Sequence, residues 1–261
     1  MQESTSNNPS IDSARITIRT IPDGFAFYTS ATEGNEHRML KLPAPIDFPD
    51  QFEDYITSEG WANQNDLFVT FIDFTKRFLL LPNSITNKEQ IKTFFDFQFF
   101  QEKEEAYQIF STPLSDGKQS FNWEMPLDRY NIFKRLFTNL DINTSTFLTI
   151  EWTLRQAASQ QKTTLVTHLF GASMLVCMAN SYGLIFANTF PIKKKEEIPY
   201  FLLRCMEQLS LNPEQTRCVI CSETISGQVI IETLHPYIQQ IEMAAFTSLP
   251  DEPLQLIGNK Q

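Results

Sequence analysis

The chain has 261 residues, of which 42% are hydrophobic and 20% charged, a composition that suits one large globular domain or two of ordinary size. Its net charge of −10 disfavours binding to a phosphate backbone. The only dense basic run, the lysines at 193–195, is followed at once by Glu196 and Glu197, a pattern typical of a solvated face, so we expect no nucleic-acid partner.

Neither the N-terminus nor the apolar segments indicate export or membrane insertion. The first ten residues are polar and lack the apolar core of a signal peptide. The uncharged stretch 163–192 is long enough to cross a bilayer, but His168, Asn180 and Asn188 divide it into strand-length pieces. Four cysteines without a signal peptide indicate reduced thiols. We therefore expect a cytoplasmic protein that does not insert directly into a membrane.

In the first half, apolar alternation and turn residues predict a three-strand meander followed by mixed helices and strands. Asp23 with Gly24, and then Gly34, mark the two turns of the meander. Thr86 and Glu89 have the spacing of a capping box, which predicts the start of a helix. In chain order the predicted strands cover 14–20, 25–30, 37–42, 67–72, 77–81, 106–111 and 120–124, and the predicted helices cover 50–59, 86–97, 128–137 and 146–159.

The second half repeats this opening, with turns at Gly171 and near Gly183. Gly34 lies 35 residues before Val69, and Gly183 lies 36 residues before Val219. The same order of elements at nearly equal spacing indicates an internal duplication. The predicted strands cover 164–170, 173–179, 184–190 and 217–221, and the predicted helix covers 196–209.

This layout predicts an α/β protein with two lobes. Three antiparallel strands, a crossover helix and a parallel fourth strand form a ribonuclease H-like unit, and two such units form the actin-like ATPase fold. We expect the first lobe over 13–160 and the second over 161–250. A disordered N-terminus at 1–12 and a flexible C-terminal tail at 251–261 complete the predicted organisation.

Three segments also resemble the motifs of an uncharacterised bacterial family: DGFAF at 23–27, RFLLLP at 77–82 and EQLSLNPE at 207–214. The likeness spans most of residues 14–247. That family has an actin-like ATPase fold and no assigned function, and more distantly the layout is similar to the cytoplasmic actin-like scaffolds of pilus assembly and type II secretion. One departure is Ser222, which stands where the family tends to have Gly before Glu223.

The resemblance implies a nucleotide cleft between the lobes, with phosphate loops at the meander turns. Actin-like ATPases carry Asp-x-Gly with Ser or Thr at the first hairpin of each lobe, where backbone amides cradle phosphates and the Asp holds metal-bound water. In the first lobe Asp23 and Gly24 lack the spacer residue, and the other candidate, Asp12, has Ala14 where Gly belongs. In the second lobe the matching loop is Gly171, Ala172 and Ser173, preceded by Leu169 in place of the Asp.

These residues therefore predict a degenerate nucleotide site, formed by Gly171, Ala172 and Ser173 with Asp23 and Gly24. No Asp or Glu occurs from 152 to 195, so a Mg²⁺ site built from both lobes would lack a carboxylate. We expect no catalytic residue, no metal and no cofactor. ATP with Mg²⁺ is the cofactor that the resemblance would imply.

Other candidate sites have simpler structural interpretations. Cys218 and Cys221 have the spacing of a zinc or redox motif, but residues three apart on a strand point to opposite faces, which favours buried thiols. His168 lies near Ser173, and the two could form a pair of general base and nucleophile. Because no carboxylate lies nearby in the sequence to orient the histidine, a hydrogen-bonded core histidine is the favoured interpretation. The tryptophans at 61, 123 and 152 are either interface anchors or core residues.

We predict a non-catalytic cytosolic actin-like scaffold that binds another protein through the cleft between its lobes or through an exposed edge. The alternative is an ATP-binding enzyme of the actin and sugar-kinase superfamily with atypical phosphate ligands. The sequence leaves the partner and the oligomeric state open.

Overall fold

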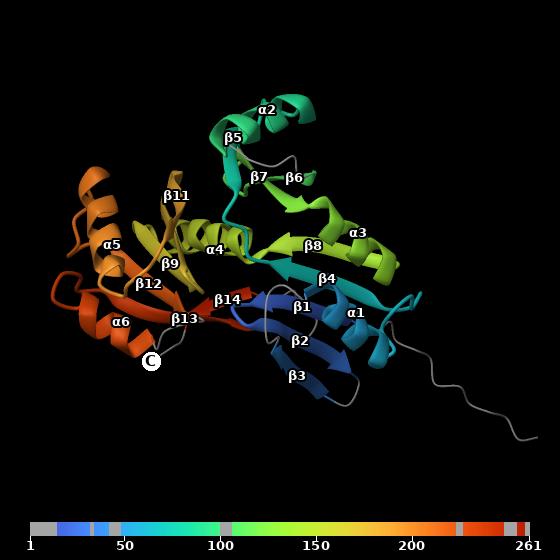
Figure 1. Ribbon diagram of the computed structural model, residues 1–261. Coiled ribbons are helices and arrows are strands. Elements are labelled where there is room, and N and C mark those ends of the chain that lie inside the picture. Colours follow the sequence, from blue (N-terminus) through green and yellow to red (C-terminus); the bar gives the residue numbers. More distant parts are fainter. Residues whose placement is uncertain are drawn as a thin grey trace, which may run out of the picture.

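The computed structural model describes residues 15–31, 34–41, 48–99, 106–222, 227–247 and 255–258. They form two large β-sheets with helices on their faces, and a small third sheet at the top of Figure 1. The strands are β1 (Arg15–Ile21), β2 (Gly24–Ala31), β3 (Gly34–Lys41), β4 (Phe68–Asp73), β5 (Phe78–Pro82), β6 (Tyr107–Pro113), β7 (Gln119–Pro126), β8 (Asn139–Thr144), β9 (Thr164–Phe170), β10 (Ser173–Asn180), β11 (Gly183–Pro191), β12 (Arg217–Ser222), β13 (Ile241–Thr247) and β14 (Gln255–Gly258). The helices are α1 (Phe48–Ser58), α2 (Lys88–Gln98), α3 (Leu127–Leu136), α4 (Ser145–Gln160), α5 (Glu197–Gln208) and α6 (Gly227–Leu234).

The two large sheets share one strand order. The first sheet runs β3-β2-β1-β4-β8 and the second runs β11-β10-β9-β12-β13-β14. Each begins with an antiparallel meander whose first strand then pairs in parallel with the next strand of the sheet. Val69 lies opposite Ile16 in the first sheet, and Val219 lies opposite Val166 in the second. The two predicted meanders are confirmed, and the superposition of the two halves stays a prediction.

Where elements differ from the prediction, the causes are local. The capping box at Thr86 is wrong, because Asn87 caps α2 by accepting hydrogen bonds from the backbone N–H groups of Glu89 and Gln90. The sequence does not predict β8, which is short, mostly polar and at the edge of the sheet beside β4. The predicted tail over 251–261 contains β14, which pairs with β13. The predicted disordered segment 1–12 lies outside the described residues.

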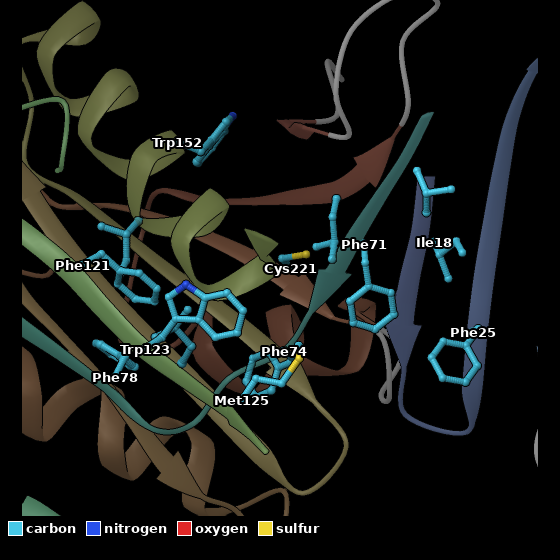
Figure 2. Packing of buried hydrophobic residues seen from close by; sticks show 14 of the residues in the cluster. Ile18, Phe25, Phe71, Phe74, Phe78, Phe121, Trp123, Met125, Trp152 and Cys221 are labelled. Atoms are coloured by element: carbon cyan, nitrogen blue, oxygen red, sulfur yellow. The ribbon is translucent and has the colours of Figure 1, made fainter. Parts of the chain in front are cut away.

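Phenylalanine rings build the core of the first lobe. Phe25 of β2, Phe71 of β4, Phe52 of α1 and Phe133 of α3 are all fully buried. The ring centroids of Phe71 and Phe133 are 4.0 Å apart, and those of Phe25 and Phe52 are 4.8 Å apart. Figure 2 shows Phe25 and Phe71 together with Ile18. Because each ring removes a large apolar area from water, this packing holds α1 and α3 against the sheet.

Helix α4 connects the two lobes and packs on the second sheet. Its buried side shares a hydrophobic cluster with residues of β9, β10 and β12, while α5 and α6 cover the opposite face of the sheet with a separate cluster. Arg217 of β12 forms an ion pair with Glu242 of β13. The same guanidinium donates a hydrogen bond to Gln156 Oε1 of α4 at 3.1 Å and lies over the ring of Trp152. One arginine thus fixes α4 to two strands of the second sheet.

The small sheet, in the order β5-β7-β6, is inserted between β4 and β8. Phe78 and Trp123 point from it into the main core (Figure 2). On its other face, Phe95 of α2 packs in a small cluster of its own. Arg77 forms an ion pair with buried Glu124 at the base of the insertion. Apolar packing therefore anchors the insertion to the first lobe, and the charge pair joins β7 to the residue that precedes β5 within the insertion.

We expect core and surface phenylalanines to differ sharply in their effect on stability. Phe133→Ala removes a fully buried ring and should lower the free energy of unfolding by about 3–5 kcal/mol. Phe97→Ala is the matched control, because Phe97 is 88% exposed, and it should change stability by less than about 0.5 kcal/mol. Urea unfolding followed by circular dichroism measures both. Equal losses for the two variants would contradict the described core.

Candidate functional site between the lobes

The two lobes meet where the ends of three central strands come together. β1 ends at Ile21, β4 ends at Asp73, and β9 ends at Phe170. In open α/β sheets, ligands bind outside the carboxyl ends of parallel strands. We call the residues around these three ends the interlobe site: Thr20, Pro22, Asp73, Phe74, Arg129, Thr149, His168, Phe170 and Gly171.

Aromatic rings fill the centre of the interlobe site. Phe74 of the first lobe stacks on Phe170 of the second, with centroids 4.4 Å apart and an angle of 8° between the ring planes. The ring of His168 is fully buried and meets Phe74 edge-on at 5.4 Å. His168 Nδ1 lies 3.5 Å from Thr149 Oγ1 of α4. His168 is thus enclosed by the two lobes, as expected for a core histidine, and a substrate would reach it only if the rings moved apart.

The carboxylate of Asp73, at the end of β4, is engaged on both oxygens. Oδ1 accepts a hydrogen bond from Thr20 Oγ1 and another from the backbone N–H of Phe74, each at 2.9 Å. Oδ2 accepts one from the guanidinium of Arg129 at 3.0 Å. Since the ion pair is partly buried, Arg129 offsets much of the cost of holding a carboxylate at this strand end.

The turns of the two meanders approach each other beside these rings. Gly171 has a φ of +54°, a left-handed conformation that glycine adopts with little strain. A Cβ atom placed on Gly171 would lie 4.0 Å from the Cβ of Pro22. A methyl group at this position would therefore make only an ordinary van der Waals contact with Pro22.

The other predicted site residues lie around the same turns. Asp23 and Ala172 are exposed, Gly24 is buried at the start of β2, and Ser173 is buried at the start of β10. Their role in binding a nucleotide stays a prediction. Leu169, which stands where the second-lobe Asp was expected, is buried in the cluster under α5 and α6, away from Phe74. Asp12, the other candidate for the first-lobe Asp, lies outside the described residues.

No role was predicted for Asp73, Phe74 and Arg129 from the sequence. One signal was available, since Asp73 directly follows a predicted buried strand, and polar residues at strand ends often face a ligand site. No local pattern points to Arg129, which lies 56 residues away in α3 and reaches Asp73 only through the fold. The stacking of Phe74 on Phe170 likewise depends on how the lobes are placed.

The residues of the interlobe site do not fit the phosphates and Mg²⁺ that an actin-like ATPase fold implies. A magnesium site needs carboxylate oxygens that are available to the metal and its waters, and both oxygens of Asp73 are already in use. The stacked rings of Phe74 and Phe170 occupy the space beside them. In the part of the chain that the structure describes, no group of three or more His, Cys, Asp or Glu residues could hold a metal ion.

Residues 3–241 match the model of a family described as "Protein of unknown function (DUF3822)". The chain belongs to the DUF3822 family. A Bacteroides thetaiotaomicron protein described as having an actin-like ATPase fold and unknown function is similar over 89% of this chain and 91% of its own, with 15% sequence identity and a TM-score of 0.73. PilM of the PilM–PilN type IV pilus biogenesis complex is similar over 90% of this chain and 88% of its own, with 9% identity and a TM-score of 0.57. No curated protein matches the sequence. The predicted family and the predicted actin-like fold are confirmed.

The four cysteines of the DUF3822 protein are free and buried. Cys218 belongs to the cluster under α5 and α6, and Cys221 belongs to the cluster under α4, so the two side chains point to opposite faces of β12 as predicted. Burial raises the pKa of the Cys218 thiol to about 12, with a smaller contribution from Glu242. Burial also raises the pKa values of Cys177 and Cys205. These thiols are structural.

Two of the three tryptophans belong to the core, and the third is partly buried against it. Trp123 and Trp152 are buried. Trp61 packs against the rings of Phe27 and Tyr55, at centroid distances of 5.5 and 6.1 Å. Their positions favour the core interpretation over that of exposed interface anchors.

A second contact between the lobes joins two hairpin tips. Lys118, after the turn between β6 and β7, donates from Nζ to the backbone carbonyl of Tyr182. The N–H of Leu184 donates to Asp116 Oδ2 at 3.3 Å. Gly183 has a φ of +135°, and a Cβ atom on it would lie 3.0 Å from Asp116 Oδ2. We call this contact of five residues the clasp, and it ties the small sheet of the DUF3822 protein to its second lobe.

We expect the cysteines to resist alkylation in the native protein. A thiol with a raised pKa has little thiolate at pH 8, and burial also blocks the reagent. Labelling by iodoacetamide at Cys218, measured by mass spectrometry, should be at least roughly 100-fold slower than in the urea-unfolded protein. Rapid labelling of native Cys218 or Cys221 would contradict a structural role.

We expect Gly183→Ala to open the clasp. The substitution adds a Cβ against Asp116 and forces alanine into a φ that favours glycine, so stability should fall by about 1–3 kcal/mol. Hydrogen exchange at the backbone N–H of Leu184 should become faster. Gly117→Ala is the matched control, since Gly117 also has a positive φ, of +70°, but open space around its Cβ position. Unchanged exchange at Leu184 in Gly183→Ala would show that the clasp tolerates the added atom.

Proposed function

We propose that the DUF3822 protein is a non-catalytic actin-like scaffold that binds another protein and whose nucleotide site is degenerate. The proposal rests on one observation, the filling of the interlobe site. Phe74 stacks on Phe170 across the lobes, and Arg129 pairs with the carboxylate of Asp73. Phosphoryl transfer depends on metal ions and cations that neutralise the charge on the phosphates. Here the strand-end carboxylate is paired with an arginine, and aromatic rings occupy the space next to it.

The charge distribution supports the same proposal. A nucleotide triphosphate brings several negative charges into a protein whose own net charge is −10. No acid occurs between 152 and 195, the region that contains the second-lobe turn, so this turn has no carboxylate of its own to hold a metal. The basic group that the interlobe site contains, Arg129, is held by Asp73.

Several observations support a protein partner in the cytosol. PilM, which shares the fold, is described in a complex with PilN, so an actin-like protein of this size can act by binding another protein. The four thiols are free, in keeping with a reducing compartment. Among the described helices, none is both long and apolar enough to cross a membrane.

The matching strand orders of the two sheets support an origin by internal duplication.

The proposal predicts that ATP with Mg²⁺ does not stabilise the protein. A ligand at a hundred times its dissociation constant stabilises the native state by about 2.7 kcal/mol, which raises the melting temperature measurably. We expect no shift in a thermal unfolding assay with millimolar Mg²⁺ and ATP, and phosphate release no faster than the protein-free background. Leu169→Asp should destabilise the protein without creating turnover, because the new carboxylate would lie in the buried cluster under α5.

The competing function, an ATP-binding enzyme, makes the opposite prediction. Steady phosphate release by the wild-type protein that is lost in Asp73→Asn would establish it and overturn the scaffold proposal. Asp141→Asn, a change of the same kind on the exposed residue of β8, is the matched control and should leave any such activity unchanged.

A further inference from the structure

Strand β11 forms an edge of the second sheet. Among the described strands it pairs only with β10. Its sequence, GLIFANTFP, has no charged residue, whereas GNEHRMLK of β3, the strand at the same place in the first sheet, contains Glu36, Arg38 and Lys41. Edge strands usually carry charges, above all lysine, that prevent pairing with another chain. This edge lacks that protection.

The hydrogen bonds near the end of β11 show which backbone groups face outward. The N–H of Ile192 donates to the carbonyl of Ala172, just before β10. The N–H of Thr189 instead donates to Asn188 Oδ1 at 2.8 Å, so a neighbouring side chain takes the place of a strand partner. Alternate residues of a strand direct their N–H and C=O groups to opposite edges. Because Ile192 faces β10, the groups of residues 190 and 188 also face β10, and those of Ala187 and Thr189 face the free edge.

The first residues of β11 already have a partner in the clasp, so the edge that is free to pair is limited to residues 186–191. The N–H of Leu184 is bound to Asp116 in the clasp. The register with β10 also shifts between Met178 and Ala179, whereas residues 186–191 pair with β10 without interruption. The free part is long enough for a short added strand.

Aromatic side chains border this free edge. The rings of Phe186 and Phe190 are stacked at 6.4 Å, and Phe190 stacks on Phe201 of α5 at 4.9 Å. Phe186 and Phe190 are only partly buried, and the neighbouring Tyr200 is 63% exposed. An added strand would place apolar side chains against this row, and such packing gives specificity to strand addition.

Positive charge lies at the C-terminal end of β11. The lysines at 193–195 are all exposed in a protein that is acidic as a whole. The carboxylate of Glu197 accepts hydrogen bonds from the backbone N–H groups of Lys193 and Lys194, and these bonds lower its pKa. Glu196 is exposed beside these lysines, but three positive charges against two negative ones leave the segment 193–197 with a formal charge of +1 in a protein of net charge −10. This end of the edge is therefore a more favourable place for an acidic group than the protein as a whole.

We propose that residues 186–191 of β11 are a docking edge for an extended segment of another protein, which adds to the sheet as an antiparallel strand. The segment has alternating apolar side chains that pack along Phe186 and Phe190, and Asp or Glu at its N-terminal end, beside the lysines at 193–195. Its carbonyl group replaces Asn188 Oδ1 as the acceptor for the N–H of Thr189. This inference rests on the proposed function and specifies where and how the partner binds.

A second copy of the chain fits this edge less well. In an antiparallel pair, the lysines of each copy would lie beside the other copy's turn at 180–183, where Asp116 is already bound by Leu184 and Lys118. In a parallel pair, lysines would face lysines. Each copy also brings a net charge of −10, so a partner with an acidic strand end is favoured over self-association.

A library of random twelve-residue peptides displayed on phage, selected on the full-length protein, tests the proposal. We expect enriched peptides with alternating apolar residues and Asp or Glu at the N-terminal end. Binding of the synthesised peptide should be at least tenfold weaker to Thr189→Pro, which removes an outward N–H that β10 does not use. The triple variant K193E/K194E/K195E should weaken it to a similar degree. Lys88→Glu and Lys134→Glu, at exposed lysines on α2 and α3, are the matched controls and should bind normally.

Methylated peptides test the backbone pairing without changing the protein. N-methylation of alternate peptide residues should abolish binding in one of the two possible patterns and be tolerated in the other. The proposal is overturned if no peptide is enriched, if the lysine triple variant and the controls bind equally, if both methylation patterns are tolerated, or if sedimentation shows a dimer that Thr189→Pro dissociates. None of these results would affect the proposed absence of nucleotide turnover, which the thermal and phosphate-release assays test independently.

Discussion

The arrangement of the two lobes depends on helix α4, which belongs to both. Its first turn is bound to the first lobe, where Ser145 Oγ donates to the carbonyl of Asp73 and Thr146 Oγ1 donates to the carbonyl of Thr75. Its remaining length packs on the second sheet, where Arg217 holds it. Because the hydroxyls bind the chain just after β4, the end of that strand cannot shift relative to α4 without loss of buried hydrogen bonds.

The interlobe site follows from this constraint. With the end of β4 held against α4, Phe74 is directed at the end of β9, where it meets Phe170 and His168. The clasp adds a second link at the far hairpin tips. The aromatic stack and the clasp thus link the lobes at two separate places.

Much of the fold could be predicted because its signals are local. Strand alternation, turn glycines and the two similar spacings to Val69 and Val219 depend only on short stretches of chain, and they predicted both meanders correctly. The failures were also local in origin. Asn87 and Thr86 are adjacent and both are good caps, so the pattern alone could not distinguish them. β8 carries too few apolar residues to stand out before its pairing with β4 is known.

The sequence by itself determined the α/β class, the two meanders, the opposite orientations of Cys218 and Cys221, and the lack of a carboxylate in the second-lobe turn. These properties depend on residue type and on the period of a strand. Only the tertiary structure decided that Arg129 neutralises Asp73, that Phe74 stacks on Phe170, and that β11 is an unprotected edge. Each of these depends on groups far apart in sequence, and their contact is set by the packing of whole sheets and helices rather than by any local preference.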